Sequence, residues 1–460
     1  MKIVVLNGSP KGDTSVTMQY VHFIQKKFPQ HELKIFNISQ RIQLIEKDEK
    51  TYLEIIDEVE QADGVLWAFP LYFYLVHAHY KRFIELIFER GTEGVFQGKY
   101  TAALSTSIHL CDHIAHDYIN AICDDLNMKY TGAFSAFMYD LLEEKKRTNL
   151  TLFAEHFFWS IENNIPTTKN FHNIPFTRFN YVPGDVEIKM DIGEKKVLVL
   201  TDSTDSQTNL GKMIERFSQS FSTEIELINL NDVDIKGGCQ GCLRCSYDNN
   251  CAYGNEDGYI EFFNNKVRPA DILVIAGTIK DHYLSSRWKM FFDRSYFNNH
   301  VPVMANKQIG FIISGPLRQQ STLKQFLEIY VQIHKSSVVD FITDEYESSA
   351  EIDKLLQSLA ERLLQFARED YMKPANFFNI GGTKILRDYI YGRGRFPFQA
   401  DHRFYKKHGL YDFPHKEYKS RITNSILMLL TKIPSIRNDI YSRRLKIEII
   451  KPLQKVLNAQ

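Results

Sequence analysis

The sequence lacks the features that would place the protein in a membrane or outside the cell. No stretch approaches the roughly 18 consecutive apolar residues that a transmembrane helix needs. No export signal precedes the first apolar run, which begins at Lys2. With nothing to suggest export, we expect the six cysteines to be reduced thiols and the protein to be cytoplasmic.

An excess of charge of either sign is also missing. The 56 Lys and Arg residues are balanced by 56 Asp and Glu residues, so the net charge is zero, which argues against a nucleic-acid-binding protein. The hydrophobic content of 44% and the charged content of 24% are typical of globular proteins. At 460 residues the chain is too long for a single core, so we expect two or three domains.

Four of the six cysteines lie in one short stretch with the spacing C-x2-C-x2-C-x5-C: Cys239, Cys242, Cys245 and Cys251. Thiolates are soft ligands, and four of them can hold an iron–sulfur cluster. A glycine precedes each of the first two cysteines, which lets the backbone fold closely around such a cluster. The spacing favours a cluster over zinc, because a zinc site usually has a longer spacer between its two cysteine pairs. Zinc, redox-active thiols and merely structural thiols remain the alternatives.

Short apolar runs alternate with helical patterns through the first part of the chain, which predicts a doubly wound α/β sheet. The predicted strands are 2–7, 32–38, 64–69, 100–106 and 129–134. The predicted helices are 16–28, 52–61, 79–88 and 113–126, followed by a helical extension over 136–164.

The same pattern returns in the second half of the chain. Residues 196–200 match 2–6 at an offset of 194 positions, and three further segments keep an offset of 208: 270–274 with 62–66, 289–293 with 81–85, and 307–314 with 99–106. The cysteine stretch lies in the interval where the offset grows. We therefore predict two copies of one fold, the second with an inserted metal-binding loop.

These patterns predict four parts: domains 1–165 and 195–370, a linker 166–194, and a basic, mainly helical extension 371–460. Residues 384–460 hold 17 Lys and Arg against 6 Asp and Glu. Amphipathic helices are predicted at 422–430 and 440–450, with Pro452 beyond the second. Three roles for this basic segment stay open: a tail against the acidic body, a docking surface for an acidic redox partner, and a membrane-surface element.

Three loops follow strand ends in the first copy, where an open α/β sheet binds ligands. The first presents hydroxyls and backbone N–H groups at a helix N-terminus and suits a phosphate. It is neither a P-loop nor a G-x-G-x-x-G fingerprint, which disfavours ATP and a Rossmann-type dinucleotide. The second is aromatic and suits a flat isoalloxazine ring, although each loop alone is also compatible with an ordinary turn or core aromatics. The candidates are Ser9, Lys11, Thr14 and Ser15 for the phosphate, Pro70, Leu71, Tyr72 and Phe73 for the ring, and Ser105, Thr106 and Ser107 for its polar edge.

The Gly-Ser-Pro loop, the Pro-Leu-Tyr loop and residues 81–85 resemble the NAD(P)H-dependent FMN reductase group of flavodoxin-like proteins. With the four cysteines added, the second copy resembles the iron–sulfur flavoproteins of anaerobes. The resemblance covers about residues 1–370. It implies two tandem flavodoxin-like sheets of strand order 2-1-3-4-5, FMN, a [4Fe-4S] cluster, electron transfer and a dimer-like arrangement of subunits.

The two copies differ at the predicted cofactor loops. The second copy has Asp202 and Asp205 where a phosphate would lie, and negative charge there is unfavourable. The first copy has no cysteines in the loop that matches the cysteine stretch. We therefore expect FMN in the first copy and the cluster in the second. No general acid stands out, since a structural role is favoured for both His109 and His113, which follow the third loop.

The resulting prediction is a flavin-dependent oxidoreductase that couples FMN to a [4Fe-4S] cluster. NAD(P)H is a candidate reductant, and ferredoxin or a small-molecule acceptor is a candidate partner; a homo-oligomer is compatible with the family. Two alternatives stay open. One is an NAD(P)H-dependent FMN or quinone reductase with structural thiols. The other is a non-enzymatic flavodoxin-like docking module with zinc or empty thiols.

Overall fold

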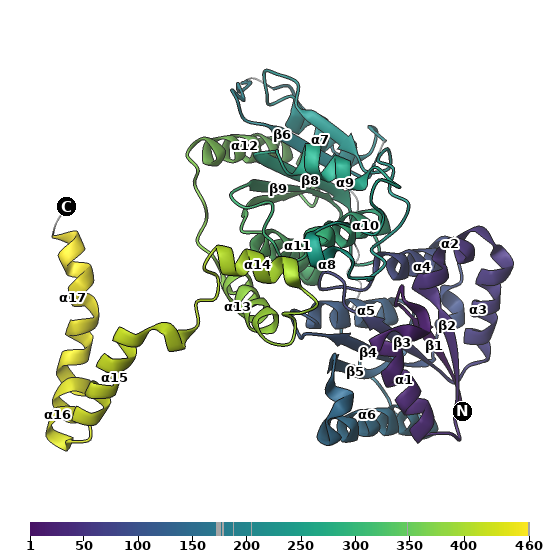
Figure 1. Cartoon of the computed structure of the whole chain (residues 1–460). Coiled ribbons are helices and arrows are strands. Elements are labelled where there is room, and N and C mark those ends of the chain that lie inside the picture. The colour runs from purple at the N-terminus through teal and green to yellow at the C-terminus, as the bar shows by residue number, and fades with distance from the viewer. Residues whose placement is uncertain (172–175, 177–178, 187, 204, 347, 459–460) are drawn as a thin grey trace. The chain divides into compact units, whose positions relative to one another are not determined.

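Two five-stranded parallel sheets organise the chain, and helices cover both of them (Figure 1). The strand order is β2-β1-β3-β4-β5 in the first sheet and β7-β6-β8-β9-β10 in the second. Both sheets have the order 2-1-3-4-5 of the flavodoxin-like fold, which confirms the predicted fold class. The strands are β1 (Lys2–Asn7), β2 (Glu32–Asn37), β3 (Gly64–Pro70), β4 (Tyr100–Ser107), β5 (Lys129–Phe137), β6 (Val197–Thr201), β7 (Glu226–Asn229), β8 (Ile272–Thr278), β9 (Gln308–Ser314) and β10 (Ser337–Thr343).

The computed structural model describes residues 1–171, 176, 179–186, 188–203, 205–346 and 348–458. The chain divides into two compact units, Met1–His402 and Arg403–Gln460. Both sheets belong to the first unit. The predicted linker 166–194 includes residues outside the described part, and the domain boundaries at 165, 195 and 370 stay a prediction.

The first copy forms around strands that are buried on both faces. Residues 3–7 of β1 are all buried, as expected for a continuous apolar run in a parallel sheet. Met18 and Val21 of α1 and Phe157 of α6 pack on one face of this sheet. The helices of this copy are α1 (Val16–Lys27), α2 (Ile38–Lys47), α3 (Glu49–Gln61), α4 (Ala78–Glu89), α5 (His113–Asp125) and α6 (Glu144–Glu162).

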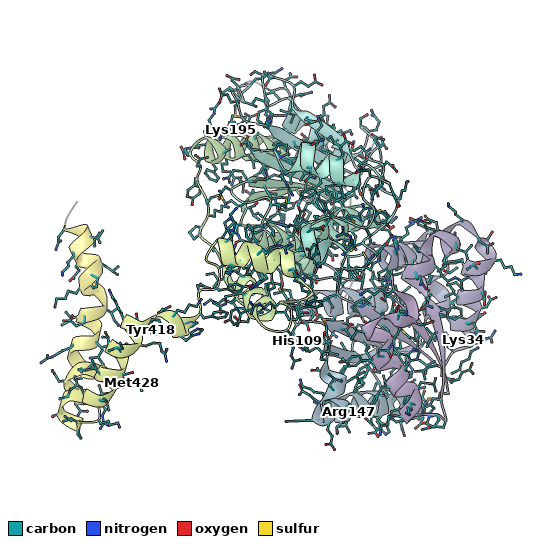
Figure 2. The ribbon with its side chains drawn as sticks, in the orientation of Figure 1. Lys34, His109, Arg147, Lys195, Tyr418 and Met428 are labelled. Atoms are coloured by element: carbon teal, nitrogen blue, oxygen red, sulfur yellow. The ribbon has the colours of Figure 1, made fainter. Side chains whose placement is uncertain are left out.

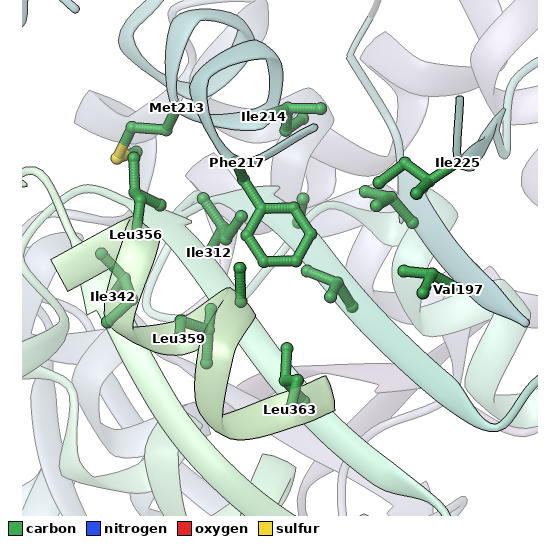
Figure 3. Packing of buried hydrophobic residues seen from close by; sticks show 14 of the residues in the cluster. Val197, Met213, Ile214, Phe217, Ile225, Ile312, Ile342, Leu356, Leu359 and Leu363 are labelled. Carbon is green, nitrogen blue, oxygen red and sulfur yellow. The ribbon is translucent and has the colours of Figure 1, made fainter. Parts of the chain in front are cut away.

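The second copy repeats this construction. Figure 3 shows Phe217 of α7 together with Leu359 and Leu363 of α12, which meet over the sheet in one buried cluster. Burying a phenylalanine or leucine of this kind contributes about 1.5–3 kcal/mol. The helices of this copy are α7 (Asn209–Ser218), α8 (Cys245–Asp248), α9 (Tyr259–Phe262), α10 (Ser286–Arg294), α11 (Ser321–Ile333) and α12 (Ser349–Arg368).

The two copies pack against each other through the equivalent helices α4 and α10. The backbone N–H of Ala78, the first residue of α4, donates to Asp293 Oδ2 at 2.8 Å. The backbone N–H of Ser286, the first residue of α10, donates to Glu85 Oε1 at 2.6 Å. The two hydrogen bonds are equivalent, because their donor residues and their acceptor residues are each 208 positions apart in the sequence. The same patch is therefore used on both copies, as in a two-fold symmetric dimer, but within one polypeptide.

A lysine in each of these helices neutralises the buried carboxylate. Lys81 Nζ lies 3.2 Å from Glu85 Oε1, and Lys289 pairs with Asp293. Both lysine side chains are fully buried. Each carboxylate thus accepts from a backbone N–H of the other copy and is paired with a lysine of its own helix, so the interface contains no unpaired charge at these positions.

Several predicted boundaries were wrong. The predicted helical extension 136–164 begins as strand, because β5 continues to Phe137 and α6 begins only at Glu144. Helix α2 was missed, because its sequence follows β2 without a turn signal. Two helices beyond α12 were also missed: α13 (Phe377–Tyr391), with two glycines in its interior, and α14 (Gln399–Lys407).

The unit Arg403–Gln460 is helical, as predicted. Its elements are η7 (Pro414–Lys416), α15 (Tyr418–Leu430), α16 (Pro434–Asp439), η8 (Ile440–Arg444) and α17 (Leu445–Leu457). Pro452 lies inside α17, not beyond its end, since loss of one backbone donor does not stop this exposed helix. Figure 2 shows Tyr418 and Met428 on α15, and both side chains are exposed. No helix of the described residues is long and apolar enough to cross a membrane.

Candidate functional site

One cavity of about 340 Å³ joins the predicted cofactor loops of the first copy to the cysteine stretch of the second. Its volume is in the range of small-molecule sites. Of the predicted residues, those that line it are Ser9, Lys11, Ser15, Pro70, Leu71, Tyr72, Phe73, Thr106, Ser107, Cys239, Cys242, Cys245 and Cys251. Thr14 and Ser105 are not in the lining.

The first loop turns sharply between β1 and α1. Ser9 N–H donates to Asn7 Oδ1 at 2.9 Å, and Ser9 Oγ accepts from Lys11 N–H at 3.3 Å. Ser15 caps α1, with its Oγ accepting from Met18 N–H at 3.2 Å. Thr14 has an exposed side chain whose hydroxyl donates to the Lys11 carbonyl at 2.9 Å. The loop therefore places two hydroxyls and one lysine at a helix N-terminus, an arrangement suited to an anion.

The second loop is a tight turn with an unusual backbone. Tyr72 and Leu75 exchange backbone hydrogen bonds of 2.8 and 3.1 Å, and Phe73 and Tyr74 between them both have positive φ, at 38° and 61°. Two left-handed residues in a two-residue turn are typical of type I′. The second copy has the same turn 208 positions later, bridging Lys280 and Tyr283. The backbone form was kept while the aromatic residues changed.

The third loop contributes two of its three candidates. Thr106 Oγ1 shares a 2.6 Å hydrogen bond with Thr17 Oγ1, and Ser107 Oγ accepts from His109 N–H at 2.8 Å. Ser105 is buried behind them, and its Oγ lies 2.8 Å from His116 Nε2. Burial lowers the pKa of His116 to about 4, so this histidine is neutral at pH 7.

The cysteine stretch closes the cavity from the second copy. Cys245 is buried, Cys239 and Cys251 are partly buried, and Cys242 is exposed. Burial raises the pKa of the Cys239 thiol and, together with the neighbouring thiols, raises that of Cys245 to about 12. Gly241 N–H donates to Cys239 Sγ at 3.4 Å, the kind of N–H···S bond that also surrounds iron–sulfur clusters.

Gly241 is required by the approach of Tyr72. Its φ is +63°, and a Cβ at this position would lie 2.0 Å from the Tyr72 hydroxyl oxygen. The aromatic loop of the first copy and the cysteine stretch of the second are therefore in direct contact. This glycine was predicted to let the backbone fold closely around a cluster. The close approach of the Tyr72 hydroxyl is a second reason for a glycine at this position.

Two histidines of the first copy hold the start of the cysteine stretch. His79 Nε2 accepts from Gly238 N–H at 2.9 Å, while its Nδ1 lies 2.8 Å from the Ser39 carbonyl. His77 Nε2 lies 2.7 Å from the Cys239 carbonyl. These partners require one proton on each ring, and burial lowers the pKa of both side chains. No local pattern marked this pair, because its partners in the cysteine stretch lie about 160 positions away.

Arg294 anchors the other side of the stretch. Its guanidinium makes two hydrogen bonds to Asp257, at 2.6 and 2.9 Å, and donates to the Gly237 carbonyl at 3.1 Å. It also lies 3.9 Å from the ring centroid of Tyr253. Because Gly237 precedes the cysteines and Asp257 follows them, one buried arginine joins both ends of the loop.

Among its described residues, the loop after β6 in the second copy differs from the loop after β1. Asp202 is bonded to Ser285 Oγ, and burial raises its pKa. The equivalent of the aromatic loop is occupied by pairs with the first copy, including Lys81 with Asp281 at 3.2 Å and His282 with Asp125 at 2.8 Å. Thr204, which belongs to the predicted loop, lies outside the described residues.

The sequence profile of the NADPH-dependent FMN reductase family matches residues 1–138 and, separately, residues 195–346. The chain belongs to the NADPH-dependent FMN reductase family. The two matches coincide with the two sheets, so this FMN reductase relative is a tandem duplication. It is a flavoprotein oxidoreductase of the NAD(P)H- and FMN-dependent kind.

Solved structures with similar folds include several flavoenzymes. The NADH:FMN oxidoreductase EMOB in its apo form is 18% identical, covering 35% of this chain and 89% of that one, with a TM-score of 0.30. FerB, an NAD(P)H:(acceptor) oxidoreductase from Paracoccus denitrificans, is 20% identical, covering 35% and 97%, with a TM-score of 0.30. An FMN-dependent NADH-azoreductase from Bacillus anthracis is 12% identical, covering 35% and 98%, with a TM-score of 0.27. No curated protein sequence matches the chain.

Within the described residues, no group of three or more His, Cys, Asp or Glu side chains is arranged to hold a single metal ion. Cavity-lining residues that were not predicted include Arg294, Tyr296, His300, His334, Leu386, Tyr389 and Phe398. The last three come from the extension beyond α12, which therefore forms part of the cavity wall. Nothing in their local sequence marked them, since they are brought to the site only by the tertiary fold.

Proposed function

We propose that this FMN reductase relative is an electron-transfer flavoprotein, with FMN in the first copy and a [4Fe-4S] cluster on the four cysteines of the second. The observation that carries the proposal is that one cavity is lined by both sets of candidate residues. Electrons pass between donor and acceptor groups that share such a site without a long protein path.

The residues fit FMN by their chemistry. Ser9, Lys11 and Ser15 offer hydroxyls and a positive charge to the phosphate, with Thr14 holding the loop through the Lys11 carbonyl. The residues proposed for the ring are Pro70, Leu71, Tyr72 and Phe73, with Thr106 and Ser107 at its polar edge and the predicted Ser105 buried behind them. When bound, FMN supplies exchange between two-electron and one-electron carriers.

The cysteines fit a cluster better than a single ion. In a [4Fe-4S] cluster each cysteine binds a different iron atom, so the sulfurs stand farther apart than around one zinc. The four thiols line one cavity together with the candidate FMN residues. The Gly241 N–H bond to Cys239 Sγ supplies a donor to one of the sulfurs. When bound, the cluster would carry single electrons.

NAD(P)H is the reductant that the family implies, and ferredoxin or a small-molecule acceptor is the proposed partner. We propose a cytoplasmic protein with domains 1–165 and 195–370, a linker 166–194, an extension 371–460, and a pseudo-dimer within each chain. A further homo-oligomer is compatible with this organisation.

A second candidate function is an NAD(P)H-dependent FMN or quinone reductase with structural thiols. The family match favours it, because the matching profile describes an NADPH-dependent FMN reductase in both copies. The two candidates share the FMN site and differ only in the role of the cysteines.

The position of FMN is tested by a matched pair of substitutions. Ser9 and Ser203 occupy the same position in the two copies, 194 residues apart. Ser9→Asp places a negative charge beside the phosphate and is expected to release FMN, while Ser203→Asp is expected to retain it. Protein-bound flavin is measured by absorbance after gel filtration. Retention of FMN by Ser9→Asp together with loss by Ser203→Asp would move the flavin to the second copy.

A further inference from the structure

The two long helices of the unit Arg403–Gln460 carry the same stripe of hydrophobic side chains. On α15 the stripe is formed by residues at positions i, i+4, i+8 and i+11, and α17 repeats this spacing 27 positions later. Residues with this spacing lie on one face of a helix. The members are Tyr418, Ile422, Ile426 and Leu429 on α15, and Leu445, Ile449, Leu453 and Val456 on α17.

Both stripes are open to solvent. Their eight side chains are between 41% and 66% exposed, whereas a helix of a globular protein normally buries such a stripe against a core. Residues 418–457, here called the C-terminal helical segment, hold sixteen described large hydrophobic side chains that are at least 40% exposed. The much longer stretch 1–402 holds seventeen. Exposed hydrophobic side chains gathered in this way mark an interaction surface, whereas scattered ones do not.

The C-terminal helical segment is also strongly basic. It contains nine Lys and Arg but only two Asp and Glu. Both acids are paired within the segment, Asp439 with Arg444 at 2.6 Å and Glu448 with Lys451 at 3.0 Å. Seven positive charges therefore remain in excess. Hydrophobic stripes combined with many Lys and Arg residues are typical of helices that lie in the interface of a membrane.

Charge and hydrophobic surface together favour lipid over two protein partners. A second copy of the segment would bring like charges together, and these repel. Residues 1–402 have the opposite charge, with 52 Asp and Glu against 43 Lys and Arg, but their exposed hydrophobic side chains are spread over a long stretch. An anionic lipid surface offers both negative headgroups and an apolar layer directly beneath them.

We propose that the C-terminal helical segment binds the surface of an anionic lipid bilayer. The stripes of α15 and α17 enter the boundary between headgroups and acyl chains, and the basic side chains remain among the lipid phosphates. Lysine and arginine can do this because their aliphatic stems span the distance from the apolar boundary to the headgroups. The inference goes beyond the proposed function, since it depends on neither FMN nor the cluster.

Flotation of the full chain with lipid vesicles tests this surface. Purified protein is mixed with vesicles of equal parts phosphatidylglycerol and phosphatidylcholine, or of phosphatidylcholine alone, and centrifuged through a density gradient. We expect binding to the anionic vesicles to be at least ~10-fold tighter, and to weaken as salt is added. Flotation needs no bound cofactor, so a failure to bind FMN would overturn the proposed function and leave this test unaffected.

Two double substitutions separate charge from hydrophobic contact. Lys419→Glu with Arg421→Glu reverses two charges in the first turn of α15, where glutamate suits the helix dipole. Ile422→Ser with Ile426→Ser removes part of the α15 stripe. Each pair is expected to weaken binding to anionic vesicles at least ~10-fold.

Matched controls lie in the first copy. Lys50→Glu with Lys145→Glu changes the charge of the chain by the same amount, at exposed first-turn positions of α3 and α6. Leu142→Ser with Leu152→Ser removes two exposed leucines. Both controls are expected to bind anionic vesicles within about twofold of the wild type.

Three results overturn the inference. The first is equal binding of the wild type to both kinds of vesicle, and the second is a control that weakens binding as much as its matched variant. The third is a wild type that floats with neither kind. If light scattering then shows a dimer that Ile422→Ser with Ile426→Ser abolishes, the stripe is an interface between copies of this chain.

Discussion

His79 Nε2 accepts a 2.9 Å hydrogen bond from the backbone N–H of Gly238, which joins helix α4 of the first copy to the cysteine stretch of the second. Leaving that N–H unpaired in a buried position costs about 1–3 kcal/mol. We therefore expect His79→Leu to lower the free energy of unfolding by this amount in urea denaturation, while His79→Gln, which can still accept, loses less. His156→Leu, at an exposed position of α6, is the control. Equal stability of His79→Leu and the control would contradict the role of this bond.

The interface between the copies predicts a large effect of Asp293→Ala. This variant leaves the fully buried Lys289 without its carboxylate partner, whereas Glu85→Ala leaves Lys81 paired with Asp281. Breaking a buried pair costs about 3–5 kcal/mol, and we expect a loss of this size from Asp293→Ala and a smaller loss from Glu85→Ala in chemical denaturation. Glu54→Ala on α3 is exposed and should change stability little. A loss below about 1 kcal/mol in Asp293→Ala would show that the reciprocal contacts do not stabilise the pair of copies.

Alanine substitutions at two glycines of the cysteine region distinguish the cost of backbone strain from the cost of a steric clash. Gly241 and Gly254 both have positive φ, at +63° and +53°, but a Cβ meets Tyr72 only at Gly241 and meets nothing within 4 Å at Gly254. Left-handed strain costs about 1–2 kcal/mol for an alanine. We expect Gly254→Ala to lose that amount and Gly241→Ala to lose more. Adding Tyr72→Phe should recover only the excess; no recovery in this double-mutant cycle would mean that the tyrosine hydroxyl is not the obstacle.

Acid is expected to destabilise the protein through buried histidines. The pKa of His116 is lowered to about 4 by burial, so the unfolded chain binds this proton more readily. Its contribution to stability is complete above about pH 6.5 and falls by about 1.4 kcal/mol per pH unit as the pH decreases toward 4. His116→Gln should reduce the difference in unfolding free energy between pH 7 and pH 5.5. An unchanged difference would contradict the assignment of a neutral, buried His116.

The fold could be predicted to a large extent because its determinants are local and repeated. Apolar runs such as 196–200, and their recurrence at offsets of 194 and 208 positions, predicted both sheets, while the resemblance to flavodoxin-like proteins predicted their strand order. Of the eleven residues predicted at strand ends, nine line the cavity, since parallel strands bring their carboxyl ends to one edge. His300 and Asp401 could not be predicted, because they are 101 positions apart and meet only through the tertiary fold.

The iron and FMN contents of the full chain, purified without oxygen, and of Cys242→Ser distinguish a cluster from structural thiols. We expect about four iron atoms and one FMN per wild-type chain, and a variant that loses iron while it retains FMN. FMN with no iron in the wild type would contradict the cluster and leave a flavin reductase with structural thiols. Iron content that Cys242→Ser does not change would place the metal elsewhere.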